Sequence, residues 1–437
     1  MVQSESEIVE LPALTLARMI RERQVSSVEV TTAHLARIAE RNEMINAVVA
    51  LADDAVDQAK ARDRAQARGE TLGKFHGVPF TTKDIIETQG LPTTLGMVEL
   101  ADNRPARDAT IVRRMREAGA ILIGKSNCPP GGSGGETVND LHGRTHNPYD
   151  VTLTPAGSSG GEAAAIASGM SPCGLGSDSG GSLRMPAHVC GIATLKPTAG
   201  LLPVTGVLDV DGALGPMSDP RTQPGPMARS VSDLSAMLDV LAGPDGHDGG
   251  AMPVPLGDAG HVDLRGLRVA LHVSDGRAVP EPDVERALRE AARALEEAGA
   301  RVADGAPPPG GHELTERVWD SYGDDLTASD LYRILWEWDR YRSTMLEFLA
   351  AFDIILTPVA PHPAVAPGAP ISWRYTTPYS LTGWPCAVVR AGASGALPIG
   401  VQVVAGPWRD HVALAAAACI EEALGGWQPP PWPPDAP

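Results

Sequence analysis

The sequence predicts an α/β protein, because strand-like and helix-like segments alternate along it. The clearest unit is a strand at Leu267–His272, an amphipathic helix at Asp283–Glu297 and a strand at Arg301–Ala303. An Ala-rich helix at Glu162–Gly169 is followed by apolar runs that read as buried strands. A third helix runs directly into a strand at Ala120–Ile123.

Length and composition indicate a large, acidic protein. Its 437 residues, 43% of them hydrophobic, provide for a sizeable core. Large α/β enzymes often form one unit of this length, so we expect a single domain over 1–437. Within it we expect N-terminal helices (11–69) wrapping a core (70–424), and a Pro-rich tail (425–437). The net charge of −18 argues against nucleic acid and anionic membrane surfaces as partners.

The cysteines and the N-terminus point to the cytoplasm. The five cysteines are widely spaced and contain no C-x-x-C, so neither a disulfide framework nor a zinc site is indicated. Met1–Glu10 is acidic and lacks the apolar region of a signal peptide. No apolar run approaches the length of a membrane span. We therefore expect a cytoplasmic protein.

The N-terminal third predicts three helices and a strand. The helices are Leu11–Arg23, one started by a Ser26/Glu29 capping box, and Ala52–Gly69. A short strand follows Gly77 and ends near Lys83.

The segment from 119 to 126, GAILIGKS, matches a phosphate-loop pattern. We reject a nucleotide site because its middle residues read as a strand, and Pro129-Pro130 prevents the helix that a phosphate loop must begin.

Later segments are assigned from composition and periodicity. The Gly- and Pro-rich stretch 198–226 is expected to cross the surface, and Ser230–Leu241 and Val412–Leu424 are expected helices. Trp319–Phe352 is helical and rich in Trp and Tyr. These aromatic side chains could pack between helices or could form a lid over the substrate, and the sequence slightly favours packing. His142 and His146 have metal-ligand spacing, but flanking Gly and Pro predict a loop and no third ligand is evident.

Two Gly/Ser clusters, at 157–161 and 176–182, suggest the chemistry. Successive backbone N–H groups in the second cluster can form a small nest that stabilises an anion. A serine at its end, Ser182, could attack a carbonyl whose oxyanion those N–H groups hold. A flexible linker is the alternative, but the apolar segments between the clusters argue against it.

These residues resemble the amidase signature family of serine hydrolases. The matching segments are 157–161 (GSSGG), 176–186 (GSDSGGSLRMP), 190–191 (CG) and 195–198 (LKPT), and Lys83 falls on the lysine of the family pattern G-[VI]-P-x-x-x-K-D. The resemblance implies a large, twisted, mixed β-sheet flanked by helices on both faces. It also makes Phe352–Pro361, Tyr379–Pro385 and Leu397–Asp410 similar to the closing strands of the family.

The resemblance also implies the roles of the site residues. Ser182 would be the nucleophile, Ser158 the bridging serine with a cis peptide, and Lys83 the base, with Ser159 the rival of Ser158. The oxyanion hole would be the backbone N–H groups of Ser179, Gly180, Gly181 and Ser182. Asp178 and Arg184 would support the site without touching the substrate. The family pattern includes no metal and no cofactor.

Lys83 must lose its proton near neutral pH to act as a base. Its apolar neighbours Val78, Phe80, Ile85 and Ile86 make burial the expected cause of a lowered pKa. The positive charge of Arg184 would lower the pKa of Lys83 further if the two side chains lay close together.

The loop Cys128–Gly135 (CPPGGSGG) departs from the commoner T-N-x-x-E-F version of the family. A pocket altered there suggests a hydrolase of anilides, oligoamides or carbamates; in the last case the protein would be a urethanase. We expect its partners to be a small-molecule substrate and water, and a homodimer is one candidate assembly. The alternative is the glutamine-hydrolysing subunit of a tRNA-dependent amidotransferase, whose glutamine-recognising residues we do not identify. A non-enzymatic binding module is disfavoured because Lys83, Ser158 and Ser182 are all present.

Overall fold

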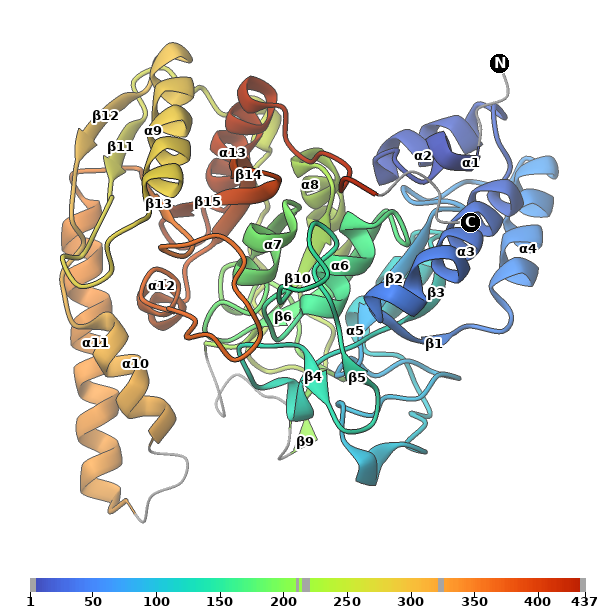
Figure 1. Cartoon of the computed structure of the whole chain (residues 1–437), viewed down its shortest axis with the longest axis horizontal. Coiled ribbons are helices and arrows are strands. Elements are labelled where there is room, and N and C mark those ends of the chain that lie inside the picture. The colour runs from blue at the N-terminus through green and yellow to red at the C-terminus, as the bar shows by residue number, and fades with distance from the viewer. Residues whose placement is uncertain (1–4, 210–211, 214–220, 321–325, 433–437) are drawn as a thin grey trace.

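A computed structural model describes residues 5–209, 212–213, 221–320 and 326–432 (Figure 1). Its centre is a mixed sheet of 11 strands in the order β1-β3-β2-β6-β10-β7-β14-β15-β13-β11-β12. These strands are β1 Val48–Leu51, β2 Pro79–Lys83, β3 Ile121–Ser126, β6 Cys173–Asp178, β7 Ala193–Lys196, β10 Gln223–Ala228, β11 Arg268–Leu271, β12 Arg301–Asp304, β13 Ile354–Pro358, β14 Cys386–Ser394 and β15 Leu397–Ala405. Two small hairpins are added, β4 Val138–Asn139 with β5 Gly143–Arg144, and β8 Leu208–Asp209 with β9 Gly212–Ala213.

Helices cover both faces of the sheet, as predicted (Figure 1). They are α1 Glu5–Ile8, α2 Ala13–Arg21, α3 Ser27–Ile45, α4 Ala55–Ala67, α5 Thr110–Glu117, α6 Gly160–Ala167, α7 Arg184–Cys190, α8 Val231–Leu241, α9 Pro282–Glu297, α10 Gly311–Asp320, α11 Ala328–Leu349, α12 Thr377–Thr382 and α13 Asp410–Leu424. Short 3₁₀ turns lie at η1 Val98–Leu100, η2 Pro130–Gly132 and η3 Ala259–His261. No helix in the described ranges is long and apolar enough to cross a membrane.

The pairing of strands positions the site. β2 runs parallel to both β3 and β6, and β11 runs parallel to β12 and β13; the other neighbours in the sheet are antiparallel. The carboxyl ends of β2 and β6 therefore meet at the same edge of the sheet, where ligands of α/β proteins commonly bind.

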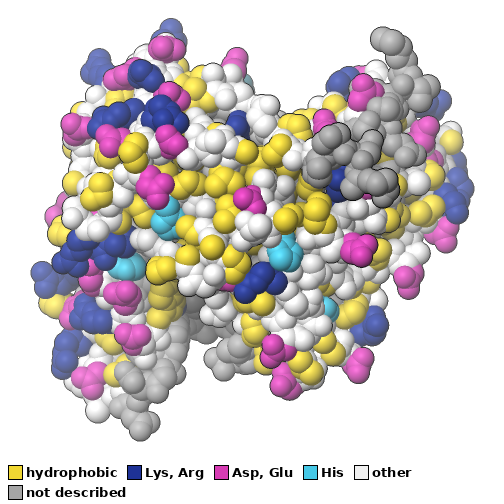
Figure 2. Space-filling model, in the orientation of Figure 1, with side chains coloured by type: hydrophobic (Ala, Val, Ile, Leu, Met, Phe, Trp, Pro, Cys, Tyr) yellow, Lys and Arg dark blue, Asp and Glu magenta, His cyan; other side chains and the backbone are white. Residues whose placement is uncertain are grey.

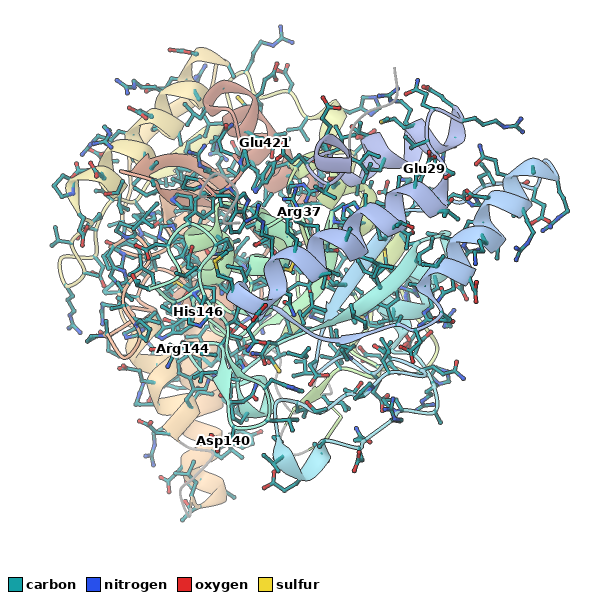
Figure 3. The ribbon with its side chains drawn as sticks, turned by 45° about the vertical axis from the view of Figure 1, so that its right-hand side comes forward. Glu29, Arg37, Asp140, Arg144, His146 and Glu421 are labelled. Atoms are coloured by element: carbon teal, nitrogen blue, oxygen red, sulfur yellow. The ribbon has the colours of Figure 1, made fainter. Side chains whose placement is uncertain are left out.

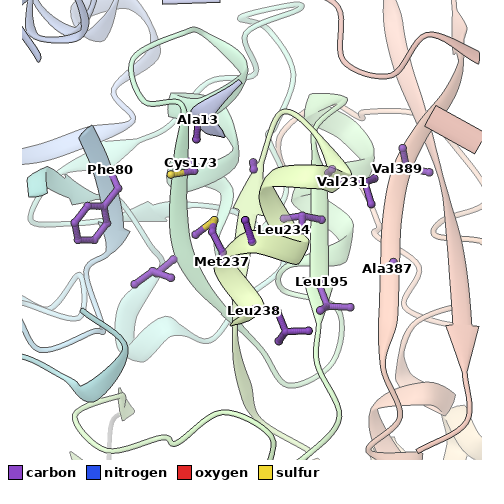
Figure 4. Packing of buried hydrophobic residues seen from close by; sticks show 14 of the residues in the cluster. Ala13, Phe80, Cys173, Leu195, Val231, Leu234, Met237, Leu238, Ala387 and Val389 are labelled. Atoms are coloured by element: carbon purple, nitrogen blue, oxygen red, sulfur yellow. The ribbon is translucent and has the colours of Figure 1, made fainter. Parts of the chain in front are cut away.

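The hydrophobic core of the described residues forms three clusters, and alternation along β14 separates two of them. Ala387 and Val389 of β14 face α8, α9 and α13, whereas Val388 packs with α6 and α7 on the other side. Figure 4 shows Leu234 and Leu238 of α8 among the side chains of the first core. Successive side chains of a strand point to opposite faces, which explains the division.

The N-terminal helices form as predicted and are fastened to the core. Ser26 and Glu29 make the reciprocal capping box that begins α3. The carboxylate of Asp233, on α8, accepts the N–H groups of Ala13 (3.0 Å) and Leu14 (2.8 Å) at the start of α2. These bonds satisfy donors that a helix N-terminus otherwise leaves unpaired.

The predicted strand at Tyr379–Pro385 is wrong. The structure forms α12 there, with Pro378 in its first turn and Gly383 ending it at a φ of 69°. Proline suits the first turn of a helix and glycine the left-handed residue after it, so these two residues define the helix. The neighbouring strand is β14, which begins at Cys386.

The predicted surface course of 198–226 is also wrong for its described part. Leu201, Leu202 and Val207 are buried, and Gln223–Ala228 is a central strand, β10. β6 pairs with β10 along its whole length, whereas β7 pairs only with Met227 and Ala228. On the β7 side, therefore, no strand requires an N–H donor from Pro224 or Pro226. This exception explains how prolines occupy a central strand.

The aromatic segment divides into α10 and α11, with Tyr322 outside the described residues. Trp338 and Tyr341 are buried, and Trp338 Nε1 donates to the Leu381 carbonyl at 2.6 Å. Tyr332 and Trp336 are exposed. Packing therefore explains part of the aromatic content, as favoured from the sequence.

Candidate active site

The site lies where the ends of β2 and β6 meet the start of α6. Lys83 is the last residue of β2, and Ser177 and Asp178 end β6. Ser158 lies two residues before α6, and Ser182 two residues before α7. Segments separated by about a hundred residues in the sequence thus converge on one small volume.

Lys83 contacts two serine hydroxyls. Its Nζ donates to Ser158 Oγ at 2.7 Å and to Ser177 Oγ at 2.9 Å, and all three side chains are buried. The peptide bond between Gly157 and Ser158 is cis. The geometry thus joins the lysine and the bridging serine that the resemblance implied.

The adjacent serines have different partners. Ser159 Oγ donates to the Ser177 carbonyl at 3.1 Å and accepts the Ser177 N–H at 3.3 Å. Its hydroxyl is therefore directed at the backbone of β6, whereas the hydroxyl of Ser158 faces Lys83. Between the two candidates for a bridging serine, the geometry favours Ser158.

Burial lowers the pKa of Lys83 to about 8, although Cys128 and Asp178 act in the opposite direction. A buried amine loses hydration of its charged form, and burial is therefore the physical cause anticipated from the apolar neighbours. Arg184, considered as a second cause, is instead paired with Asp178. Near neutral pH a usable fraction of Lys83 is the free amine.

Ser182 lies on the turn that follows β6. Its carbonyl accepts the Ser159 N–H at 3.2 Å, which places the turn directly beside the Ser158 segment. The Ser182 residue is partly exposed, and its hydroxyl has no hydrogen-bond partner within the described part of the chain. A hydroxyl of this kind is accessible to a substrate.

One of the predicted oxyanion donors is occupied. The Gly181 N–H donates to Asp178 Oδ1 at 2.8 Å, because the Asp178 carboxylate gathers the amides of the turn. The N–H groups of Ser179, Gly180 and Ser182 have no acceptor among the residues that the structure describes. An oxyanion hole in this conformation therefore has three available donors rather than four.

Asp178 and Arg184 form a fully buried, bidentate ion pair behind the turn. Arg184 Nε and Nη2 each donate to Asp178 at 2.9 Å, and Nη1 reaches the Thr376 carbonyl (2.9 Å) and Gln402 (2.8 Å). Burial alone would raise the pKa of Asp178, but the Arg184 guanidinium holds it below its usual range. The pair fixes the turn to α12 and β15, which agrees with the supporting position expected of it.

The structure adds residues that the sequence did not suggest. Ser177 is the second acceptor of Lys83, and Glu162 lies behind the same strands, accepting from Thr81 and Ser126. Burial raises the pKa of Glu162 to about 7. The signal that could have identified Ser177 is the parallel pairing of β2 and β6, which brings the residues at their carboxyl ends side by side.

The loop that departs from the family pattern borders Lys83. A side chain built at Gly132 would begin 3.7 Å from Lys83 Nζ, and the Gly131 N–H donates to the Leu95 carbonyl at 2.8 Å. His142 contacts Thr94 and His146 contacts the Val151 carbonyl, so the two histidines face different neighbours. No group of three or more His, Cys, Asp or Glu in the described ranges could hold a metal ion.

Comparisons with known proteins agree with this geometry. A family model, Amidase, matches residues 29–322 and 324–414. An acylamidase of Rhodococcus erythropolis is 32% identical over 97% of this chain and 97% of its own length. A glutamyl-tRNA(Gln) amidotransferase subunit from Chloroflexus aurantiacus is 33% identical, covering 92% of this chain and 94% of the relative. The crystal structure of a bacterial aryl acylamidase superposes with a TM-score of 0.84 and 26% identity, over 97% of this chain and 96% of that one.

Proposed function

Because this chain belongs to the amidase signature family of amide-hydrolysing enzymes, we propose that it cleaves C–N bonds through an acyl-enzyme on Ser182. The observation that carries the proposal is the buried 2.7 Å hydrogen bond between Lys83 Nζ and Ser158 Oγ, beside the turn that bears Ser182. A lysine with a pKa of about 8 is a suitable base for such a relay.

The proposed mechanism begins with neutral Lys83. Lys83 accepts the proton of Ser158, Ser158 accepts that of Ser182, and Ser182 Oγ bonds to the carbonyl carbon. The N–H groups of Ser179, Gly180 and Ser182 stabilise the oxyanion. The C–N bond then breaks as the relay returns the proton to the leaving nitrogen. Water attacks the acyl-enzyme through the same relay, releasing the acid and restoring Ser182.

For the substrate we propose anilides, oligoamides or carbamates, the last making the protein a urethanase. The support is the glycine-rich loop beside Lys83, which departs from the commoner family pattern. A β-carbon at Gly132 would lie 3.7 Å from Lys83 Nζ and 2.9 Å from the Ile85 side chain, so the loop borders the base closely enough to shape the space for a leaving group.

The alternative remains a glutamine-hydrolysing amidotransferase subunit, since one such protein is as similar to this chain as the acylamidase. A glutamine site must neutralise the free α-amino and α-carboxylate groups of its ligand, and unpaired charged residues are the usual means. The charged side chains of the turn itself, Asp178 and Arg184, are already paired with each other. This observation favours the hydrolase.

A substrate panel decides between these functions. We expect turnover of p-nitroanilides, simple amides, aryl carbamates or p-nitrophenyl esters by the protein alone, measured by release of the amine or phenol. Glutamine should be hydrolysed at least tenfold more slowly, because the available groups do not match its charges. Activity confined to glutamine would instead support the amidotransferase function.

We propose a cytoplasmic location, supported by the five cysteines, all of which are free thiols. We also propose a homodimer formed by α11. Leu331, Leu335 and Leu346 lie on one face of this helix with 46–50% of their surface exposed, although leucine is usually buried. Asp339 and Arg342 lie on the same face between them.

This face of α11 is self-complementary about a two-fold axis. An antiparallel second copy that placed Leu335 opposite Leu346 would also place Asp339 opposite Arg342, because both pairs are centred on the same point of the helix. A symmetric interface requires this reciprocity. Light scattering after size exclusion should give twice the chain mass, and Leu335→Arg should give a folded monomer whose melting temperature falls only by the stabilisation that association supplies. A monomeric wild type, or a dimeric Leu335→Arg protein, would contradict the proposal.

A further inference from the structure

An open cavity of about 480 Å³ lies beside the predicted active site. Its walls come from the loop that follows β3 and from the segment before α12. The lining residues that matter most are Pro129, Pro130, Gly135, Ile371 and Trp373. On the face of the molecule shown in Figure 2, most charged side chains lie toward the outline of the molecule.

The cavity is joined to the catalytic turn by Trp373. A β-carbon built at Gly181, the residue before Ser182, would lie 3.1 Å from Trp373 Cε3. A β-carbon built at Gly135 would lie 3.2 Å from Trp373 Cζ2. The indole ring therefore spans from the oxyanion turn to the glycine-rich loop, and these two glycines leave the space that it occupies.

The cavity is joined to the bridging serine as well. A β-carbon at Gly157 would lie 2.7 Å from the Gly134 carbonyl oxygen, so the cavity loop rests on the peptide that carries Ser158. Wall residues of the cavity therefore contact the residue before Ser158 and the residue before Ser182.

The walls combine apolar side chains with polar groups of Ser133 and of the glycine-rich backbone, and the charge among the lining residues is paired. Two prolines, Ile371 and the indole of Trp373 supply apolar surface, with Val138 and Ala369 at the margin. Glu136 is the charged residue that lines the cavity, and it is paired with Arg144 and accepts the Gly368 N–H. Figure 3 labels Arg144, the last residue of β5.

We propose that this cavity binds an uncharged aryl group of the substrate, with Trp373 as its specificity-determining contact. Aromatic rings gain from stacking against an indole and from leaving water, and proline surfaces accommodate flat rings without losing side-chain entropy. A charged group would find no unpaired charge of opposite sign among the lining residues. This inference rests on the proposed hydrolase function and names the substrate class for the same site.

The test compares aryl and aliphatic amides in three variants. In Trp373→Ala the KM for benzamide or acetanilide should rise about tenfold, while the KM for acetamide should change less than twofold. In Gly135→Val the added side chain enters the cavity, and the same selective rise is expected; Trp373→Phe should restore most of the aryl preference. A rise for benzamide places the ring on the acyl side, and a rise for acetanilide places it on the amine side.

Trp336→Ala, which removes an exposed indole of α11, is the matched control and should leave all three KM values unchanged. Each variant must keep the melting temperature of the wild type within a few degrees to be counted. Equal changes in KM for aryl and aliphatic amides, or no change, would overturn the proposed aryl site. The proposed hydrolase function would still stand if turnover depended on Ser182.

Binding supplies a readout that does not require turnover. Benzamide and acetanilide should quench the tryptophan fluorescence of Ser182→Ala saturably, and this quenching should be lost in Ser182→Ala/Trp373→Ala. If the wild type hydrolyses none of the amides or esters, the proposed function fails, and the titration still decides the cavity on its own. Unsaturable quenching that is equal in both proteins would overturn the cavity proposal.

Discussion

Ser182→Ala is expected to lower the turnover of every substrate by about four orders of magnitude or more, with the fold unchanged. The hydroxyl forms no hydrogen bond within the described ranges, so its removal leaves no partner unsatisfied. It does remove the atom that must bond to the carbonyl carbon. The measurement is the initial rate on the best substrate of the panel, with the melting temperature as the check on folding.

The neighbouring serines provide the control for this experiment. Ser158→Ala should also cause a loss of several hundredfold or more, because it interrupts the path between Ser182 and Lys83. Ser159→Ala should cost far less activity, since its hydroxyl bonds to the backbone of β6. Near-wild-type rates in folded Ser182→Ala would end the acyl-enzyme mechanism, and a larger loss in Ser159→Ala than in Ser158→Ala would exchange the roles of the two serines.

Much of the site could be predicted because its residues are local in sequence. The turn 178–184 specifies its own shape, with Asp178 accepting the amides of Gly181 and Leu183. The pairing of Lys83 with Ser158 is not local, and it was available only through the resemblance. Ser177 and Trp373 could be predicted neither from local sequence nor from the resemblance. The position of Ser177 depends on strand pairing, and that of Trp373 on a segment that packs from another part of the chain.

The fold was predictable where periodicity or caps were strong, as in α3, α9 and α13. It was mispredicted at β10, where glycine and proline suggested a surface segment, and at α12, where the family resemblance suggested a strand. β10 contains two prolines and is nevertheless a central strand, because its neighbour β7 pairs with only two of its residues. The segment of α12 was predicted as a strand from its resemblance to the family, although Pro378 and Gly383 at its ends are typical of a short helix. The β10 error arises from tertiary context, which local sequence does not contain. The α12 error does not, because Pro378 and Gly383 are local signals of a helix.

In the proposed mechanism Arg184 supports the site without acting on the substrate. Its guanidinium is fully buried and makes hydrogen bonds to Asp178, Thr376, Ser380 and Gln402. A buried ion pair contributes little net stability, but removal of one partner leaves an uncompensated charge. Its value here is geometric, since it holds the turn whose free N–H groups face the reaction.

Lys83→Met is expected to lower kcat/KM by about two to four orders of magnitude at pH 7 and to abolish the pH dependence near pH 8. In the wild type the neutral amine is the active form, so the rate should rise with pH, half-maximal near the Lys83 pKa of about 8. At pH 7 about one tenth of Lys83 is neutral, and above pH 9 nearly all of it is. Methionine fills a similar volume without burying a charge, so the fold should be retained.

Lys125→Met is the matched control, because burial also lowers the pKa of Lys125 to about 8. A pH profile alone therefore cannot separate the two lysines. Lys125 Nζ donates to the Ile86 carbonyl, Thr88 and Thr93, and to none of the serines of the site. Its replacement can cost stability, but the remaining activity should keep the rise near pH 8. If Lys125→Met loses that rise and Lys83→Met keeps it, the base is Lys125 and the relay through Ser158 must be abandoned.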